Sequence, residues 1–257
     1  MGTGAPGTAG SLERFEALLT PRGRELLARL DTDAVTPATA LRTGTALRAE
    51  YPAELVAAAL TQHELRIQAR AKFGRAGQMF FTRAGLEQAS SEVVARYRAR
   101  RYAHAGPVAD LCCGIGGDLI ALAQDHPVLA VDIDPLHLRM AQANAGVYGA
   151  AGNVRAVCAD VRDIGFPMVD AVFIDPARRS GGRRMRAGES EPPLSWCVAL
   201  AGRGGSAGIK AAPGLPHDAV PAGCTLCIDP GSDRAKPRPT IFVGERNAAA
   251  HLRHVGS

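Results

Sequence analysis

The sequence predicts an α/β protein in which a doubly wound, mostly parallel sheet follows an N-terminal helical region. From Pro107 onward, short apolar runs rich in strand-forming residues alternate with helical segments. Such alternation is typical of parallel strands joined by crossover helices. Before that point, apolar residues recur at helical spacing between residues 12 and 103. The predicted strands are residues 108–112, 128–133, 154–158, 171–174 and 207–211.

The N-terminal helical region is predicted to span residues 12–103. An apolar stripe continues after Pro21, a residue that suits the first turn of a helix. Residues 53–71 and 86–102 give the clearest further helices, separated by two glycines. Residues 1–11 are rich in Gly, Ala and Thr, and we expect them to form a disordered leader.

The sheet domain is predicted to span residues 104–223, with helices after its strands. These helices are expected to reach residue 124 after the first strand and to cover residues 135–148 and 193–200. Residues 224–257 are interpreted as an atypical C-terminal tail. Within it, residues 240–243 can form one short strand, but no pattern completes a large domain.

The composition indicates a protein without membrane spans or disulfide bonds and says little about its partner. The net charge is +5, but only three of the 30 basic residues are lysines, a bias that looks genomic, so the charge favours a nucleic-acid partner only weakly. No apolar run reaches the ~20 residues of a membrane span, and residues 1–11 do not resemble a signal peptide, so we expect a cytoplasmic protein. The six cysteines are expected to be reduced thiols. Cys224 and Cys227 have the spacing of a zinc-binding pair, but no second Cys or His pair accompanies them, so no metal site is predicted.

A glycine-rich turn after the first predicted strand indicates a ligand site. Gly114 and Gly116 allow the backbone to approach a ligand, and ligands bind at the carboxyl ends of strands in such sheets. The third glycine of a dinucleotide-binding turn is absent, and Asp118 would place a negative charge near a phosphate. A ligand with an ammonium group fits better, because Asp110 at the strand end can accept its hydrogen bond.

Two further acidic residues follow the next two predicted strands. Asp132 ends the second strand, where a carboxylate can accept both hydroxyls of a ribose, and Asp134 is expected to cap the next helix. Asp160 follows the third strand and is expected to accept from an adenine amino group, with Val161 packing on the ring. Three acids after three successive strands predict a nucleoside site.

Four motifs resemble, in this order, those of class I S-adenosylmethionine-dependent methyltransferases: residues 110–117, 131–135, 159–160 and 173–178. The set is most similar to the RNA cap guanine-N2 (trimethylguanosine synthase) group and to bacterial methyltransferases with a THUMP-like C-terminal domain. The resemblance also includes residues 80–88, which that group places near the cofactor. It implies a Rossmann-like fold, S-adenosylmethionine as cofactor, and cofactor contacts from Cys112, Gly117, Ile133 and Thr82 as well.

The similarity to the bacterial group ends in the C-terminal part. Those proteins continue beyond their equivalent of residues 208–214, whereas the tail after Cys224 resembles nothing in them. The hypothesis that follows is a truncated or frameshifted reading frame. On that hypothesis, the sheet is expected to lack its usual final hairpin.

The catalytic motif predicts the chemistry. Asp175 ends the fourth strand, and its carboxylate with the Pro176 carbonyl can accept both protons of an exocyclic amine. The aromatic residue that often follows in amino-directed enzymes is absent, so Phe81, Phe80 or Trp196 is considered as the missing ring. Arg178 and Arg179 begin a basic, Gly-rich loop that suits contact with a phosphate backbone.

The predicted activity is methylation of a nucleobase amino group, with RNA as the favoured partner and DNA or protein left open. Two alternatives remain. One is a catalytically impaired, cofactor-binding remnant of a truncated methyltransferase. The other is an NAD(P)-dependent oxidoreductase, against which the missing third glycine and Asp118 both count.

Overall fold

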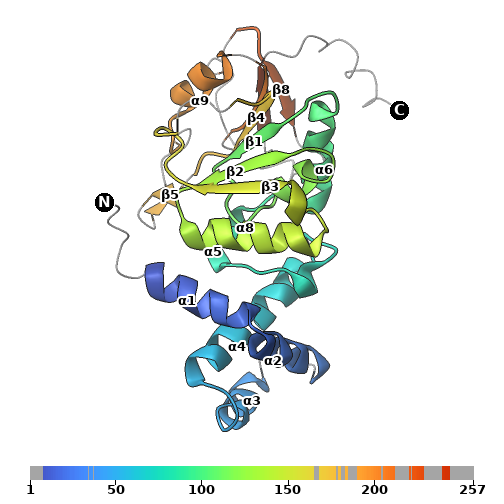
Figure 1. Ribbon diagram of the computed structural model, residues 1–257, viewed down its shortest axis with the longest axis vertical. Coiled ribbons are helices and arrows are strands. Elements are labelled where there is room, and N and C mark those ends of the chain that lie inside the picture. The colour runs from blue at the N-terminus through green and yellow to red at the C-terminus, as the bar shows by residue number, and fades with distance from the viewer. Residues whose placement is uncertain are drawn as a thin grey trace.

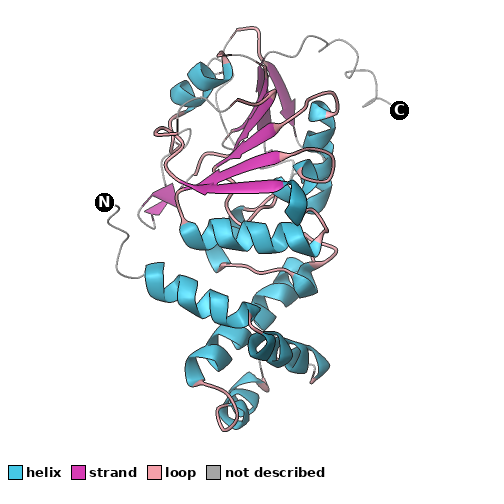
Figure 2. Cartoon of the chain, viewed as in Figure 1, coloured by secondary structure: helices cyan, strands magenta, loops and turns pink. Residues whose placement is uncertain are grey.

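The computed structural model describes residues 8–33, 35–36, 38–164, 168–177, 179–180, 183–184, 190–203, 205–211, 220, 222–228 and 239–243. The helices within residues 8–69 lie at one end of the molecule and the sheet at the other (Figure 1). Figure 2 shows the same division into a helical part and a mixed part. No helix in these ranges is both long and apolar enough to cross a bilayer.

The N-terminal region contains α1 (Thr8–Leu19), α2 (Pro21–Thr32), α3 (Ala40–Leu47), α4 (Ala53–Ala69), the short 3₁₀ helix η1 (Ala76–Gln78), α5 (Arg83–Gln88), α6 (Glu92–Ala99) and η2 (Arg100–Tyr102). Thr20 caps α2, and Pro21 occupies its first turn as expected. The helix α1 begins at Thr8, so the expected disordered leader is wrong for residues 8–11, while residues 1–7 lie outside the described part.

The predicted helix at residues 86–102 is interrupted. Ala89 has an extended backbone (φ −58°, ψ 141°), and α6 starts only after Ser91. Lys72 Nζ donates to the carbonyl oxygens of Leu86 (2.6 Å) and Ala89 (2.9 Å), which satisfies the end of α5. The apolar spacing could not reveal this break, because Lys72 belongs to a different part of the sequence.

The sheet has seven strands in the order β3-β2-β1-β4-β7-β9-β8. The strands are β1 (Val108–Leu111), β2 (Val128–Asp132), β3 (Val154–Cys158), β4 (Ala171–Ile174), β7 (Ser206–Lys210), β8 (Thr225–Ile228) and β9 (Pro239–Val243). The first five are parallel to one another, as predicted. A separate two-stranded ribbon consists of β5 (Arg179–Ser180) and β6 (Arg183–Arg184).

The C-terminal part completes the sheet, contrary to the expected loss of the final hairpin. Both β8 and β9 are antiparallel, and β9 pairs with β7 through Ile209 and Ile241. The predicted strand at residues 240–243 is confirmed, but the boundary at residue 223 does not coincide with the end of the sheet. The prediction failed because β8 is only four residues long and follows a turn-rich segment that hides its pairing with β9.

Helices cover both faces of the sheet. On one face lie α6, α7 (Leu119–Leu122) and α8 (Pro135–Val147), where Leu119, Leu138 and Phe173 belong to one buried cluster. On the other face lies α9 (Leu194–Ala201), with Cys197 and Leu200 against the strands (Figure 1). A short 3₁₀ helix, η3 (Ala151–Asn153), leads into β3.

The N-terminal helices share a core with the sheet domain. Phe15 and Phe81 belong to the same buried cluster as Ile115 of the glycine-rich turn and Met140 of α8. Arg139 of α8 also forms an ion pair with Glu16 of α1, at 2.6 Å. The helical region is therefore packed against the sheet domain beside the turn that follows β1.

Candidate functional site

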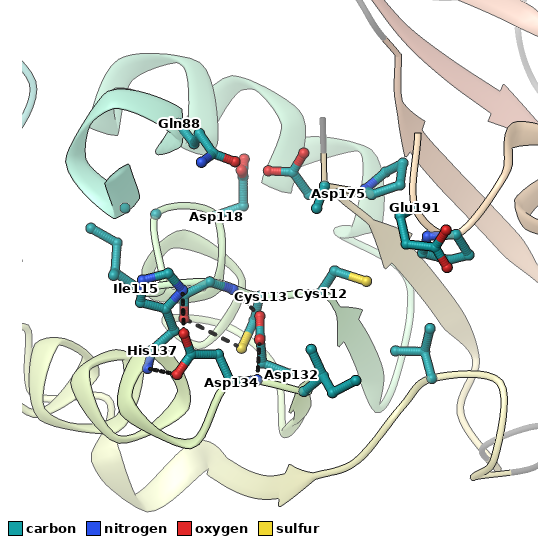
Figure 3. Close-up of a pocket in the computed structure, with 18 of the residues that line it drawn as sticks. Gln88, Cys112, Cys113, Ile115, Asp118, Asp132, Asp134, His137, Asp175 and Glu191 are labelled. Atoms are coloured by element: carbon teal, nitrogen blue, oxygen red, sulfur yellow. Dashed lines mark hydrogen bonds and ion pairs between the residues drawn. The ribbon is translucent and has the colours of Figure 1, made fainter. Parts of the chain in front are cut away.

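A cavity of about 450 Å³ lies at the carboxyl ends of β1, β2, β3 and β4. Its walls come from the glycine-rich turn, from the segments after β2, β3 and β4, and from residues 85–90 of the N-terminal region (Figure 3). The position agrees with the rule that parallel sheets bind ligands beyond their strand tips. The volume is in the range of small-molecule sites.

The glycine-rich turn places three glycines in three different environments. Gly114 (φ +55°) lines the cavity, and a Cβ added there would meet no atom within 4 Å. Gly116 (φ +89°) instead packs against α8, where a Cβ would lie 3.1 Å from the Cα of Ala141. Gly117 lines the cavity and packs against Ala89 and Ser90. Gly114 thus leaves open space at the cavity wall, whereas Gly116 allows the close approach of α8, and the expected contact of these glycines with a ligand stays a prediction.

Cys112 begins this turn with a left-handed backbone. Its φ of +63° is uncommon for a residue with a side chain. Cys112 lines the cavity as expected, and burial raises the pKa of its thiol well above the ordinary value. The side chain therefore presents a neutral sulfur to the cavity.

We expect Gly116→Ala to lower the free energy of unfolding by about 2–4 kcal/mol, because a left-handed backbone and a crowded Cβ both add cost. Chemical denaturation measures the change. Gly152→Ala is the matched control, because its Cβ would meet nothing within 4 Å and its φ is not positive. Equal stability of the two variants would contradict this role of Gly116.

Asp132 stands at the end of β2 and faces the cavity. Its Oδ2 accepts from the Gly114 N–H at 2.7 Å, and its Oδ1 accepts from the Asp134 N–H at 2.8 Å. Burial raises the pKa of this carboxyl, and the two hydrogen bonds only partly offset it. Asp134 caps α8 as predicted, accepting from the N–H groups of Leu136 and His137.

Ile133 lies next to this carboxylate and lines the cavity. Its side chain is 67% exposed, which is unusual for a large apolar residue. Val161 lines the cavity from the segment after β3 and is buried. The two apolar side chains form walls against which a flat ring can pack.

Asp110 is buried at the end of β1, and neither of its carboxylate oxygens has a hydrogen-bond partner among the described residues. Burial, followed by the nearby charges of Asp118 and Asp175, raises the pKa of Asp110 well above its usual value. Asp110 does not line the cavity itself, although the Gly-rich turn that begins directly after β1 does. An unpartnered buried carboxyl is costly unless a ligand satisfies it.

Asp160 lines the cavity but is already paired. Its carboxylate accepts from Arg162, with Oδ2 at 2.6 Å from Nη2, and this guanidinium lowers the pKa of Asp160. Arg162 also forms an ion pair with Glu191 at 2.7 Å, across from the segment after β4. The sequence did not reveal Arg162 as a link between these two walls of the cavity.

Asp175 and Pro176, the residues predicted to be catalytic, line one end of the cavity, with Asp118 and Gln88 opposite (Figure 3). The Asp175 N–H donates to the Leu111 carbonyl at 3.0 Å, so the backbone after β4 is tied to β1. Asp175 Oδ2 also accepts from Lys210 Nζ, a contact that the sequence analysis missed. Its only sequence signal was a lysine that closes the apolar run of β7.

Asp118 belongs to a buried ionic cluster with the N-terminal region. Arg98 Nη1 donates to Asp118 Oδ1 at 2.6 Å, and Ser90 Oγ donates to Oδ2 at 2.7 Å. Burial raises the pKa of Asp118, but Arg98, Lys210 and Ser90 outweigh it, so the net shift is downward. The negative charge of Asp118, which the sequence analysis counted against a phosphate ligand, is therefore neutralised by the ion pair with Arg98.

Thr82 reaches the cavity only through His137. Its Oγ1 caps α5 by accepting from the Gly85 N–H at 2.9 Å, and it lies 2.8 Å from His137 Nε2. His137 and Gly85 line the cavity, whereas Thr82 does not. Thr82 therefore positions the wall of the cavity and makes no direct lining contact.

Of the side chains expected to bind the substrate, the structure describes the aromatic ones, and none of these lines the cavity. Phe81 is 1% exposed and packs against Phe73 at a ring distance of 5.8 Å, so its expected contact with a substrate is wrong. Phe80 is buried against Phe15, and Trp196 packs on the opposite face with α9, away from the cavity lining. Arg178 and the side chain of Arg179 lie outside the described part of the structure.

Within the described residues, no group of three or more His, Cys, Asp or Glu side chains is placed to hold a metal ion.

Two family models match the chain. Residues 105–186 match the RNA cap guanine-N2 methyltransferase model, which covers the first four strands of the sheet and the catalytic motif. Residues 11–69 match a domain of unknown function that corresponds to α1–α4. The N-terminal helices and the sheet thus match separate family models.

Two curated relatives and a solved structure are similar to this chain. The chain is 38% identical, over 167 residues, to uncharacterized S-adenosylmethionine-dependent methyltransferases of two Mycobacterium tuberculosis strains, CDC 1551 / Oshkosh and H37Rv. The match covers 61% of this chain and 44% of those proteins, so the chain spans less than half the length of these relatives.

A provisionally named methyltransferase of Porphyromonas gingivalis W83 has a similar crystal structure, with a TM-score of 0.61 and 21% identity. The similarity covers 77% of this chain and 52% of that one, and it concerns the fold alone. The sheet region therefore has the Rossmann-like fold of class I methyltransferases, and the chain is similar in sequence to S-adenosylmethionine-dependent methyltransferases.

Proposed function

We propose that this protein methylates an exocyclic amino group of a nucleobase in RNA. The observation that carries the proposal is the placement of Asp175 and Pro176 on the wall of the cavity that also contains the glycine-rich turn and Asp132. The family model over residues 105–186 describes RNA cap guanine-N2 methyltransferases, which supports an amino group of RNA as acceptor.

The residues present fit S-adenosylmethionine. Asp110 offers a buried carboxyl with no partner among the described residues, Gly114 leaves open space above the turn, and Ile133 exposes an apolar surface at the rim. These features suit, respectively, the ammonium, the methionine chain and the adenine of the cofactor. The bound cofactor supplies an electrophilic methyl group on a sulfonium.

The ribose and adenine contacts follow from the remaining walls. Asp132 keeps lone pairs for ribose hydroxyls while two backbone N–H groups fix its orientation. Asp160 can accept a hydrogen bond from the adenine amino group, either while it also contacts Arg162 or after that ion pair opens. Val161 and Ile133 pack on the ring from the segments after β3 and β2.

On the substrate side, Asp175 accepts a hydrogen bond from the target amine. The Pro176 carbonyl accepts the second proton, so the nitrogen lone pair is directed toward the methyl group. As positive charge develops on the nitrogen, the Asp175 carboxylate stabilises it. Gln88 faces this end of the cavity and can donate to or accept from the edge of a base (Figure 3).

The test is transfer of labelled methyl groups to fractionated RNA, followed by nuclease digestion and chromatography of the nucleosides. We expect label in a nucleoside methylated on an exocyclic nitrogen. Label only in DNA or protein would refute RNA as the substrate. Cofactor binding without any transfer would instead favour an impaired cofactor-binding protein, and NAD(P) binding in a titration would favour an oxidoreductase.

A further inference from the structure

Lys210 is a buried amine at the catalytic end of the cavity. Its side chain is 2% exposed, and its Nζ contacts Asp175 Oδ2. The same Nζ lies 3.9 Å from Asp118 Oδ2 and 3.5 Å from the Gln88 carbonyl oxygen. A lysine is seldom buried to this extent unless a carboxylate pairs with it.

The sheet register places the two residues together. In the parallel pairing of β4 with β7, Ile174 lies opposite Ile209. Asp175 follows Ile174 directly after β4, and Lys210 follows Ile209 as the last residue of β7. The two residues therefore lie at the same edge of the sheet. Their contact is therefore fixed by the backbone and does not depend on a flexible loop.

Asp175 is the main ionic partner of Lys210 among the nearby carboxylates. Asp118 already has Arg98 at 2.6 Å as its partner. Asp110 is buried, which raises the pKa of its carboxyl and disfavours the charged form, and no contact between it and Lys210 Nζ is seen among the described residues. Of the two carboxylates that form ion pairs with Lys210 among the described residues, only Asp175 therefore lacks a closer cation.

We propose that Lys210 is a positioning residue that holds Asp175 as an oriented carboxylate, with Oδ2 engaged and Oδ1 available to the acceptor amine. Without the ammonium, Asp175 would stand beside Asp118 with no cation of its own among the described residues, and its side chain would lose a fixed orientation. This inference rests on the proposed function, because it assigns Asp175 to the acceptor.

The first experiment measures the contact without using activity. Thermal unfolding is compared for Lys210→Met, Asp175→Asn and the double variant, with Arg203→Met as the control because Arg203 is an exposed basic residue near β7. We expect Lys210→Met to lower the Tm by roughly 5–10 °C and the control to change it little. The loss of Tm in the double variant should be clearly smaller than the sum of the losses in the two single variants.

The second experiment measures catalysis on the same four proteins. We expect Lys210→Met to lower kcat about 10–100-fold, with the Kd for S-adenosylmethionine and the KM for RNA changed less than about threefold. In the Asp175→Asn background, the same substitution should cost less than about threefold, because its effect passes through Asp175. Lys210→Gln, which keeps a donor without the charge, replaces Lys210→Met if that variant does not fold.

The outcomes separate the two proposals. Unchanged kcat in Lys210→Met, or an equal loss with and without the Asp175 carboxylate, would overturn the role of Lys210. Additive losses of Tm would do the same. If the wild-type protein transfers no methyl group to RNA, the proposed function fails, and the unfolding measurements still decide whether Lys210 holds Asp175.

Discussion

Asp175→Ala is expected to lower the rate of methyl transfer about 10²–10⁴-fold while the Kd for S-adenosylmethionine changes less than about threefold. The carboxylate lies at the catalytic end of the cavity, whereas the residues placed for the ribose and the adenine follow β2 and β3. Its removal therefore takes away the acceptor for the amine proton and leaves the cofactor contacts in place. Single-turnover kinetics and a binding titration measure the two quantities separately.

Asp163→Ala is the matched control, because Asp163 is an exposed acid that does not line the cavity. Its activity should equal that of the wild-type protein. If Asp175→Ala loses cofactor affinity and transfer together, Asp175 is a cofactor ligand or a structural residue. Removal of Asp175 also leaves Lys210 buried without its carboxylate, so the Tm must be recorded for each variant.

Asp110→Asn is expected to stabilise the protein by about 1–3 kcal/mol at neutral pH and to weaken S-adenosylmethionine binding about 10–100-fold. The buried carboxyl has no hydrogen-bond partner among the described residues, and its ionised form is strongly disfavoured. An amide avoids the cost of holding an ionisable group in this position. It also removes the negative charge that the cofactor ammonium would contact, so stability and affinity change in opposite directions.

The stability gained by Asp110→Asn should depend on pH. In the folded protein the pKa of Asp110 is raised well above its usual value, while in the unfolded chain it is about 3.9. Between those values the folded state binds more protons, so the stability contributed by this carboxyl falls as the pH rises. The gain from Asp110→Asn should therefore be larger at pH 8 than at pH 5 in denaturant unfolding.

The exposed Asp125 supplies the control for that experiment, since Asp125→Asn should alter neither stability nor affinity. A loss of stability in Asp110→Asn would show that the carboxyl makes a favourable contact in the folded protein. Unchanged affinity for S-adenosylmethionine would remove Asp110 from the cofactor site and leave the other contacts to be tested one by one.

The parallel strands and the order of the acidic residues followed from the sequence. Apolar runs of four or five residues between helical segments predicted β1 to β4 and β7 within one residue of their observed bounds. Asp132, Asp160 and Asp175 come to one edge of the sheet because parallel strands all present their carboxyl ends there. The likeness to proteins with a THUMP-like C-terminal domain stays a prediction.

Other features depended on contacts between distant segments. Ser90, Arg98 and Asp118 meet in a buried cluster although they belong to the N-terminal region and the sheet domain. The β8–β9 hairpin was missed because short antiparallel strands are stabilised by their neighbours in the sheet more than by their own residues. Phe81 was considered as a replacement for the aromatic residue missing from the catalytic motif, and the sequence gave no information on the Phe73 ring that packs against it.

The sequence by itself determined the parallel strands of the sheet, its glycine-rich turn and the acids at its strand tips, because apolar periodicity and turn chemistry are local properties of the chain. Tertiary structure alone decided which of those acids are free to meet a ligand. Arg98 neutralises Asp118, Arg162 occupies Asp160 and Lys210 holds Asp175, whereas Asp110 has no partner among the described residues. The state of a carboxylate depends on the cations that the fold brings to it. Arg98 and Lys210 lie far in the sequence from the acids they contact, whereas Arg162 follows Asp160 by two residues.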